Sequence, residues 1–194
     1  MLQQINSLIN KLNPSTRFLV LFIPLVVIWF ISYHLIYGIT FFNVEHDILT
    51  SFSVILAKQA NFLLELLGFE TNIEIHEDMV VSKILKYKYQ HGVWIGEPCN
   101  GIKIFGVFSI FILCLRSKWN YKLLFIAIGI FILHLLNVIR VASLTYIAAV
   151  NPKILDFNHN ITFQIIIYSA MLLLWLFFIK KFTNSCLLYT SPSP

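Results

Sequence analysis

The stretch LLFIAIGIFILHLLNVIRVASLTYIAAV, residues 123–150, is the longest apolar run of the chain. A helix needs about 20 residues to cross a hydrocarbon core about 30 Å thick, so this stretch predicts a membrane span. It contains His134, Asn137 and Arg140. Ionisable groups are costly inside a span and therefore point to function or to a partner within the protein. We interpret His134 as an interhelical hydrogen-bonding residue rather than a proton relay.

The composition also indicates a membrane protein. Of the 194 residues, 58% are hydrophobic and only 12% are charged, whereas soluble domains carry about 25% charged residues. The net charge is +5, but the basic residues gather at the ends of apolar runs, where they act as topology signals. We therefore expect membrane lipid, and no nucleic acid, around this chain.

Three further apolar runs, residues 18–39, 101–115 and 161–179, predict additional spans. The expected fold is an all-α polytopic membrane protein with about four transmembrane helices. With both termini cytoplasmic, four spans place these basic residues inside, as the positive-inside rule prefers: Lys11, Arg17, Arg116, Lys118, Lys122, Lys180 and Lys181. A fifth span through residues 48–67 would move the Arg116 loop and the Lys180 pair outside.

Residues 48–67 are apolar but place polar side chains on one helical face, at about 100° per residue. These side chains are Ser51, Lys58, Asn61 and Glu65. The pattern predicts an amphipathic or re-entrant helix that lies at the interface or packs against other helices, rather than a lipid-exposed span.

The only long polar segment comes next, and apolar and polar side chains alternate along it. The alternation covers residues 72–76, 83–84 and 86–89 and predicts a small β-hairpin outside the membrane, in an extracytoplasmic segment of about residues 69–98. Near its turn lie His76, Glu77 and Asp78. These residue types can bind metal, but a solvated turn is the more ordinary interpretation. We expect no metal site and no cofactor.

The cysteines indicate neither a disulfide framework nor a zinc cluster. Cys99, Cys114 and Cys186 show no paired spacing, and Cys114, in the middle of a predicted span, is interpreted as a packing residue. Residues 186–194, CLLYTSPSP, resemble the translated read-through of a sequencing adapter. We therefore expect residues 1–185 to form a single membrane domain and set the remainder aside.

Cys99, Arg140 and His159 are predicted to meet at one edge of the bilayer. Cys99 lies just before the second predicted span, and His159 lies just before the last. At ~1.5 Å per residue, Arg140 lies about 26 Å along its span, close to the outer boundary. Each has an ordinary interpretation alone: a packing cysteine, an arginine that reaches lipid head groups, and a loop histidine. Together, and with Asn137 one turn before Arg140, they predict a site.

These three residue types can carry nucleophilic catalysis. A thiol attacks as the thiolate, which a helix amino terminus opening at Gly101 and a nearby cation would both favour. Histidine can take up the thiol proton and return it to a leaving amine. Arginine can stabilise the oxyanion of a tetrahedral intermediate. A site at the membrane edge suits a substrate that is itself tethered to the membrane.

The motifs around these residues resemble those of the exosortase/archaeosortase family. Residues 97–101, Glu-Pro-Cys-Asn-Gly, resemble the family's E-x-C-x-G motif, and residues 137–140 resemble its N-x-x-R element. His159, before the closing span, resembles the family histidine, although Asn160 stands where many relatives carry glycine. The resemblance covers about residues 18–182, and the small size is similar to that of the compact exosortases of Bacteroidetes-type bacteria.

The resemblance implies a membrane-embedded cysteine protease or transpeptidase. Cys99 would be the nucleophile, Arg140 the transition-state stabiliser and His159 the general acid and base. Supporting positions would be Glu97, Asn100, Gly101 and Asn137. Of these, Glu97 is expected to cap the helix that follows it.

The implied substrates are exported proteins whose carboxyl-terminal sorting signal contains a short motif, a transmembrane helix and a basic tail. Cleavage would occur at the periplasmic face of a bacterial inner membrane, followed by transfer to an acceptor whose chemistry stays open. Two other functions also stay open. One is a non-enzymatic assembly or scaffold subunit. The other is a four-span thiol oxidoreductase, which would need paired cysteines on the outer face, where only Cys99 is expected.

Overall fold

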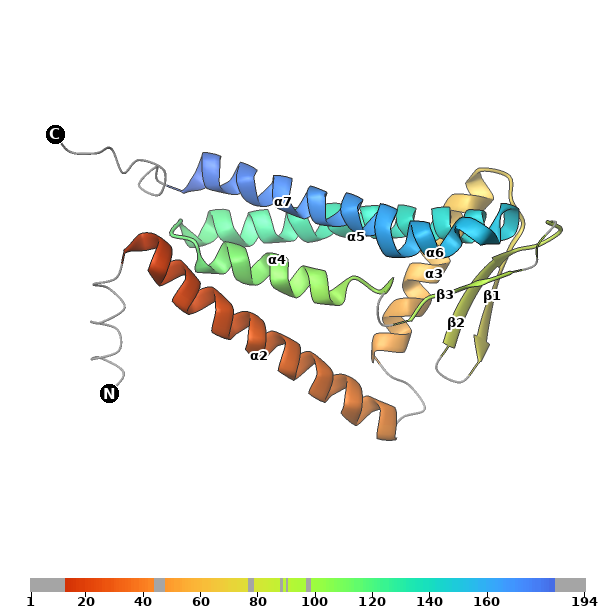
Figure 1. The fold of residues 1–194 in the computed structure, drawn as a ribbon, viewed down its shortest axis with the longest axis horizontal. Coiled ribbons are helices and arrows are strands. Elements are labelled where there is room, and N and C mark those ends of the chain that lie inside the picture. Colours follow the sequence, from red (N-terminus) through yellow and green to blue (C-terminus); the bar gives the residue numbers. More distant parts are fainter. Residues whose placement is uncertain are drawn as a thin grey trace.

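The computed structural model describes residues 13–43, 48–76, 79–87, 89, 91–96 and 99–183. Helices dominate it, and a small sheet lies at one end (Figure 1). In chain order the elements are α2 (Pro14–Asn43), α3 (Ile48–Leu66), β1 (Thr71–His76), β2 (Met79–Ile84), β3 (Val93–Trp94), α4 (Ile102–Cys114), α5 (Trp119–Val150), the 3-10 turn η2 (Pro152–Ile154), α6 (Leu155–Phe157), the π-helical turn η3 (Asn158–Thr162) and α7 (Phe163–Phe182).

Three helical stretches among the described residues are long and apolar enough to cross a membrane: Ser15–Leu35, Trp119–Val150 and Pro152–Phe182. The chain is therefore a polytopic membrane protein. The apolar helix α4 has 13 residues and spans only about 20 Å at 1.5 Å per residue, less than the hydrocarbon thickness of about 30 Å. The fourth full span expected at residues 101–115 accordingly stays a prediction.

The core of the membrane bundle is formed by α4, α5 and α7. Phe108 and Ile112 of α4 are fully buried against Phe125, Leu133 and other apolar side chains. Helix α2 lies against α4 and diverges from the bundle toward its carboxyl end (Figure 1). The close approach depends on a glycine, since a Cβ at Gly106 would lie 2.1 Å from Cε2 of Trp29. Up to Leu35, α2 exposes many apolar side chains, as a lipid-facing helix does.

A second core lies at the other end of α5, where α3 and the sheet pack against it (Figure 1). Leu56, Ala60, Val80, Val141 and Ala142 are among its buried members. The interpretation of residues 48–67 as a helix packed against other elements is confirmed, and this helix is not one of the candidate spans.

The polar face predicted for that helix is divided in the structure. Asn61 is buried and accepts a hydrogen bond from Ser82 Oγ of β2, and Thr145 Oγ1 of α5 donates to the same Ser82 Oγ at 3.4 Å. Lys58 and Glu65 are instead exposed. The buried amide of Asn61 thus has the hydrogen-bond partner that a buried polar group needs. Through Ser82, the same small network connects α3, β2 and α5.

The predicted β-hairpin is present but belongs to a three-stranded sheet. β1 and β2 pair antiparallel from Thr71 opposite Ile84 to His76 opposite Met79, so the turn falls at the predicted place. Glu77 and Asp78 themselves lie outside the described residues. The expectation of strand structure at residues 86–89 is wrong for the described positions 86, 87 and 89, since Lys86 adopts φ 60° in a turn and no strand follows it there. The third strand is β3, which is too short for its alternation to be read.

Candidate active site

Cys99 lies in the short connection between β3 and α4, at the boundary between the two cores. Its backbone N–H donates to Gly96 O at 2.9 Å, and its side chain is only 3% exposed, within the core that α3, the sheet and α5 share. The thiol sulfur Sγ lies 3.2 Å from His159 Nε2. The structure therefore brings together two predicted site residues that are 60 positions apart.

The backbone after Cys99 depends on Asn100 and Gly101. Gly101 adopts φ +79°, a left-handed conformation that costs other residues about 1–2 kcal/mol. A Cβ there would also lie 3.1 Å from Asn137 Nδ2. Asn100 Oδ1 accepts a hydrogen bond from the N–H of Ile102 at 3.0 Å and so satisfies one backbone donor in the first turn of α4. This is the role expected of Glu97, which lies outside the described residues together with Pro98.

Asn137 connects α5 to the cysteine. Its Nδ2 donates to the carbonyl oxygen of Cys99 at 2.7 Å, and its side chain is buried. The motif glycine and this asparagine are thus close neighbours, and a side chain at position 101 would push against the amide that reaches Cys99. The sequence places the two motifs 36 residues apart, so their contact is visible only in the fold.

Arg140 lies one turn after Asn137 on the same helix and is only 4% exposed. Within the part of the chain that the structure describes, its Nε and the Oδ1 of Asn137 have no hydrogen-bond partner. A buried N–H donor without a partner is unfavourable unless an acceptor completes it. Arg140 therefore presents unused donor capacity beside the thiol, on which its charge acts directly.

His159 lies in the π-helical turn η3, within a continuous helical run from Pro152 to Phe182. The sequence predicted a loop at His159, and the structure shows a helical turn instead. π-turns are frequent at functional sites. Its Nδ1 lies 3.0 Å from Asn160 Oδ1. An amide oxygen can only accept, so the proton belongs on Nδ1, and the free lone pair of Nε2 faces Cys99.

Asn160 is a site residue that the sequence did not single out for any role. It is exposed and directly follows His159. The polar run at residues 158–160 just before an apolar helix was the available signal, but a run of this kind also marks an ordinary loop.

Burial raises the pKa of the Cys99 thiol above its usual range, against the positive charge of Arg140 and a backbone hydrogen bond from Gly96, which both lower it. The net direction is opposite to the expectation of a preformed thiolate. Burial prevails because an apolar core disfavours the charged form. The resting group is therefore a neutral thiol, and its activation requires a base, for which His159 Nε2 is in position.

His134, a further polar residue of the bundle, has a partner on a neighbouring helix. His134 Nε2 lies 2.8 Å from Gln59 Oε1 and joins α5 to α3, which confirms its interpretation as an interhelical hydrogen-bonding residue. Cys114, at the far end of α4, is partly buried. No group of three metal-ligating side chains was found in the described ranges.

Comparison with known protein families identifies a match. A family model described as transmembrane exosortase matches residues 15–176, a range that includes Cys99, Asn137, Arg140 and His159. Neither a curated protein nor a solved structure matches the chain significantly. Because the family model covers most of the sequence, the chain belongs to the transmembrane exosortase family.

Proposed function

We propose that this exosortase-family protein is a cysteine-type peptidase and transpeptidase that cleaves the carboxyl-terminal sorting signal of exported proteins. The observation that carries the proposal is the 3.2 Å contact between Cys99 Sγ and His159 Nε2. Covalent catalysis by a thiol requires a base within hydrogen-bond reach of the sulfur, about 2.6–3.2 Å. The imidazole of His159 lies at that distance.

The first half-reaction forms an acyl-enzyme. His159 Nε2 takes the proton from Cys99 as the sulfur adds to the scissile carbonyl carbon, giving a tetrahedral oxyanion. Arg140, buried with an unpartnered Nε, stabilises that oxyanion, a contribution of about 10² to 10³ in rate for one donor elsewhere. The C–N bond then breaks, the proton on His159 passes to the leaving amine, and a thioester remains on Cys99.

The second half-reaction releases the product. An acceptor carrying an amine or hydroxyl group, or water, loses its proton to His159 Nε2 as it attacks the thioester carbonyl. The C–S bond breaks, and the proton returns to sulfur, so the thiol is regenerated. The acceptor determines whether the outcome is transfer or hydrolysis, and the chemistry of these side chains serves both.

The position of the site suits a membrane-tethered substrate. Arg140 lies about 32 Å from the start of α5 at 1.5 Å per residue, so the site is close to the far edge of the hydrocarbon region. The α4–α5 loop at the other end carries Arg116 and Lys118, which the positive-inside rule assigns to the cytoplasm. We infer a bacterial inner-membrane protein with cytoplasmic termini and a periplasmic site.

The test is processing of a tail-bearing substrate in a strain that lacks the chromosomal gene. We expect Cys99→Ala, Arg140→Ala and His159→Ala to abolish or strongly reduce the cleaved product. Cys114→Ala is the matched control, since it removes the other described thiol without touching the site, and should process normally. Full processing by Cys99→Ala would refute the proposal and favour the scaffold alternative.

A further inference from the structure

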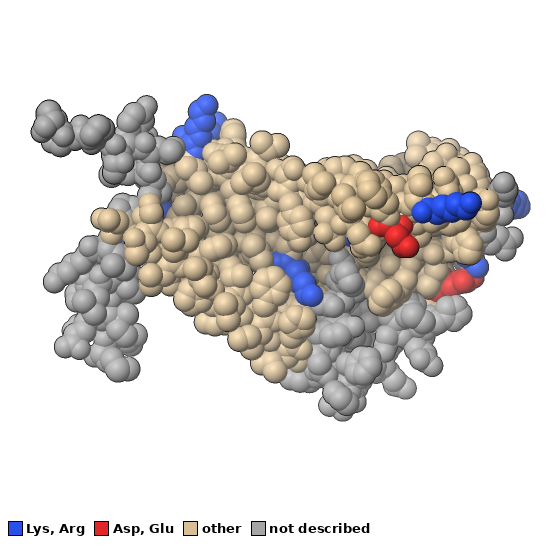
Figure 2. All heavy atoms as spheres, in the orientation of Figure 1, with Lys and Arg blue, Asp and Glu red and all other residues tan. Residues whose placement is uncertain are grey.

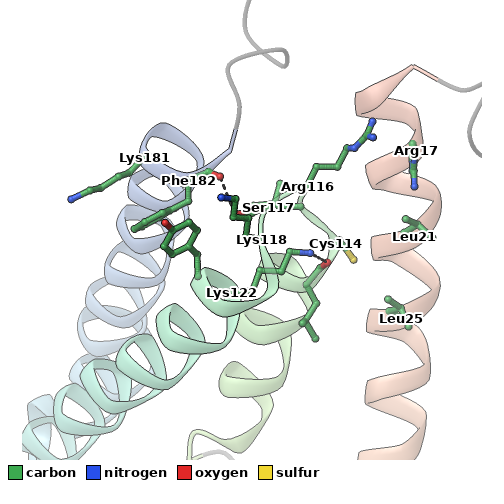
Figure 3. A pocket seen from close by; sticks show the side chains of 13 residues that line it. Arg17, Leu21, Leu25, Cys114, Arg116, Ser117, Lys118, Lys122, Lys181 and Phe182 are labelled. Carbon is green, nitrogen blue, oxygen red and sulfur yellow. Dashed lines mark hydrogen bonds between the residues drawn. The ribbon is translucent and has the colours of Figure 1, made fainter.

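Basic side chains gather at the other end of the bundle, around the loop that joins α4 to α5 (Figure 3). A cavity of about 860 Å³ opens there between α2, this loop and the ends of α5 and α7. Five basic residues line it: Arg17, Arg116, Lys118, Lys122 and Lys181. None of the described residues that line it is acidic. The volume is within the range of about 300–1,000 Å³ that is usual for ligand sites.

The positive charge at this end has no compensation within its own segments. All nine acidic residues of the chain fall within residues 45–97 or at Asp156, so residues 1–44, 98–155 and 157–194 contain none. In Figure 2 the Asp and Glu side chains that are visible lie toward the end that carries the sheet. An acidic partner for the cations around the cavity would therefore have to come from other segments or from outside the chain.

Among these cations, Lys122 gives the strongest reason to expect a bound anion. It is only 6% exposed, and its Nζ donates to the carbonyl oxygen of Leu113 at 2.8 Å and lies 5.0 Å from the ring centroid of Trp119. These contacts orient the ammonium group but carry no formal negative charge. Buried lysines are rare unless an anion accompanies them.

The arginines form the mouth of the same cavity. In Figure 3 the Arg116 side chain extends from the α4–α5 loop toward Arg17 of α2, whereas Lys181 points outward from the opposite rim. Two guanidinium groups across a gap offer the forked donors that bind phosphate oxygens in pairs.

Much of the remaining cavity wall is apolar. Leu21 and Leu25 of α2 and Leu113 of α4 line it, and they continue into helices whose outer faces are apolar. A free inorganic anion would gain nothing from this wall. A ligand with an anionic head and a hydrocarbon chain would contact both parts.

We propose that this cavity binds the phosphate headgroup of an anionic phospholipid from the leaflet at this end of the bundle. The phosphate lies between Arg17, Arg116 and Lys122, and an acyl chain follows the leucines of α2. Basic pockets between transmembrane helices on the cytoplasmic side are suited to such lipids. Because α4 separates the cavity from Cys99 by its whole length of 13 residues, the inference does not rest on the proposed catalysis.

The test is lipid binding by the full chain, purified in a neutral detergent and measured by native mass spectrometry. Phosphatidylglycerol and phosphatidylcholine with identical chains are titrated separately, and inorganic phosphate serves as a third ligand. We expect phosphatidylglycerol to bind at least tenfold more tightly than phosphatidylcholine, and inorganic phosphate not to compete at equal concentration. Equal binding of both lipids, or equal competition by phosphate, would overturn the proposal.

Variants separate a built site from general charge attraction. Arg116→Gln should weaken phosphatidylglycerol binding about fivefold, the loss expected for one basic residue near a charged surface. Lys180→Gln removes the same charge at the same end but does not line the cavity, and should leave binding nearly unchanged. Leu25→Trp fills the apolar wall without altering charge and should also weaken binding. Equal effects of Arg116→Gln and Lys180→Gln would show diffuse attraction only and refute the site.

Discussion

Cys99 Sγ lies 3.2 Å from His159 Nε2, although 60 residues separate the two positions. One residue precedes the short helix α4, and the other lies in a π-turn at the start of the last helical run. Asn137 holds the first through its carbonyl oxygen, and Asn160 faces the second at Nδ1. The contact is therefore supported on both sides by amide groups from separate segments.

Asn160→Ala should lower the processing rate about tenfold while the protein folds normally. Without the Oδ1 acceptor, the imidazole no longer favours the tautomer whose Nε2 lone pair faces the thiol, and wrong tautomers reduce rates strongly in catalytic triads. Asn158→Ala is the matched control, since its Nδ2 donates to Ile154 O one turn earlier and not to His159. The readout is single-turnover cleavage of a tail-bearing substrate, with Asn160→Asp expected to restore much of the rate. Equal losses in the two alanine variants would show a merely structural role.

Alkylation of Cys99 should be slow at neutral pH and should rise with pH beyond the ordinary thiol range, near pH 8.5. A raised pKa means that the thiolate is scarce below that pKa and accumulates only as the pH passes it. In a Cys114→Ala, Cys186→Ala background, the iodoacetamide rate reports this thiol alone.

Arg140→Gln should move the same alkylation profile to still higher pH, because the arginine charge lowers the pKa of the Cys99 thiol. The measurement is the midpoint of the rate against pH in both backgrounds. With Arg140 intact, an alkylation rate of Cys99 that stays constant from about pH 6 upward would indicate a preformed thiolate, contrary to this account.

Gly101→Ala should destabilise the protein and abolish processing. The substitution adds left-handed strain of about 1–2 kcal/mol and forces a Cβ to within 3.1 Å of Asn137 Nδ2, which disturbs the hydrogen bond to Cys99. Gly68→Ala offers a close control, since Gly68 has φ +88° and no atom within 4 Å of its Cβ position. Both variants should unfold at a lower temperature in detergent because both carry the backbone strain. Only Gly68→Ala should retain processing activity. Normal processing by Gly101→Ala would contradict the described contact.

Topology reporters should test the short helix α4. A fusion after Tyr89 is expected to report a periplasmic location, and a fusion after Ser117 a cytoplasmic one, because the basic loop and the catalytic residues lie at opposite ends of α4. The same location for both reporters would show that α4 does not cross the membrane and would refute the four-span arrangement.

Much of the membrane architecture follows from the sequence, because spans depend on length and apolarity alone. Residues 123–150 and the terminal spans were predictable on these grounds. The hairpin was predictable from alternation, but β3, with two residues, is too short for a period, and Lys86 took a turn conformation that composition does not reveal.

The site was only partly predictable. Spacing placed Cys99, Arg140 and His159 at one level of the bilayer, and the structure brings the thiol and the imidazole into contact. The direction in which the pKa of the Cys99 thiol shifts was not predictable, since it depends on how deeply α3, the sheet and α5 bury the sulfur. The partnership of His159 with Asn160 depends on the π-turn, which has no sequence signature.

The most direct test of the central claim is detection of the acyl-enzyme. The purified protein is mixed with a substrate peptide that carries a sorting signal, quenched in acid and mapped by mass spectrometry, with and without hydroxylamine. The account predicts a substrate fragment on Cys99 as a hydroxylamine-sensitive thioester, which Cys99→Ala does not form and His159→Ala forms far more slowly. Cleaved substrate without any adduct on Cys99, or cleavage by Cys99→Ala, would contradict it.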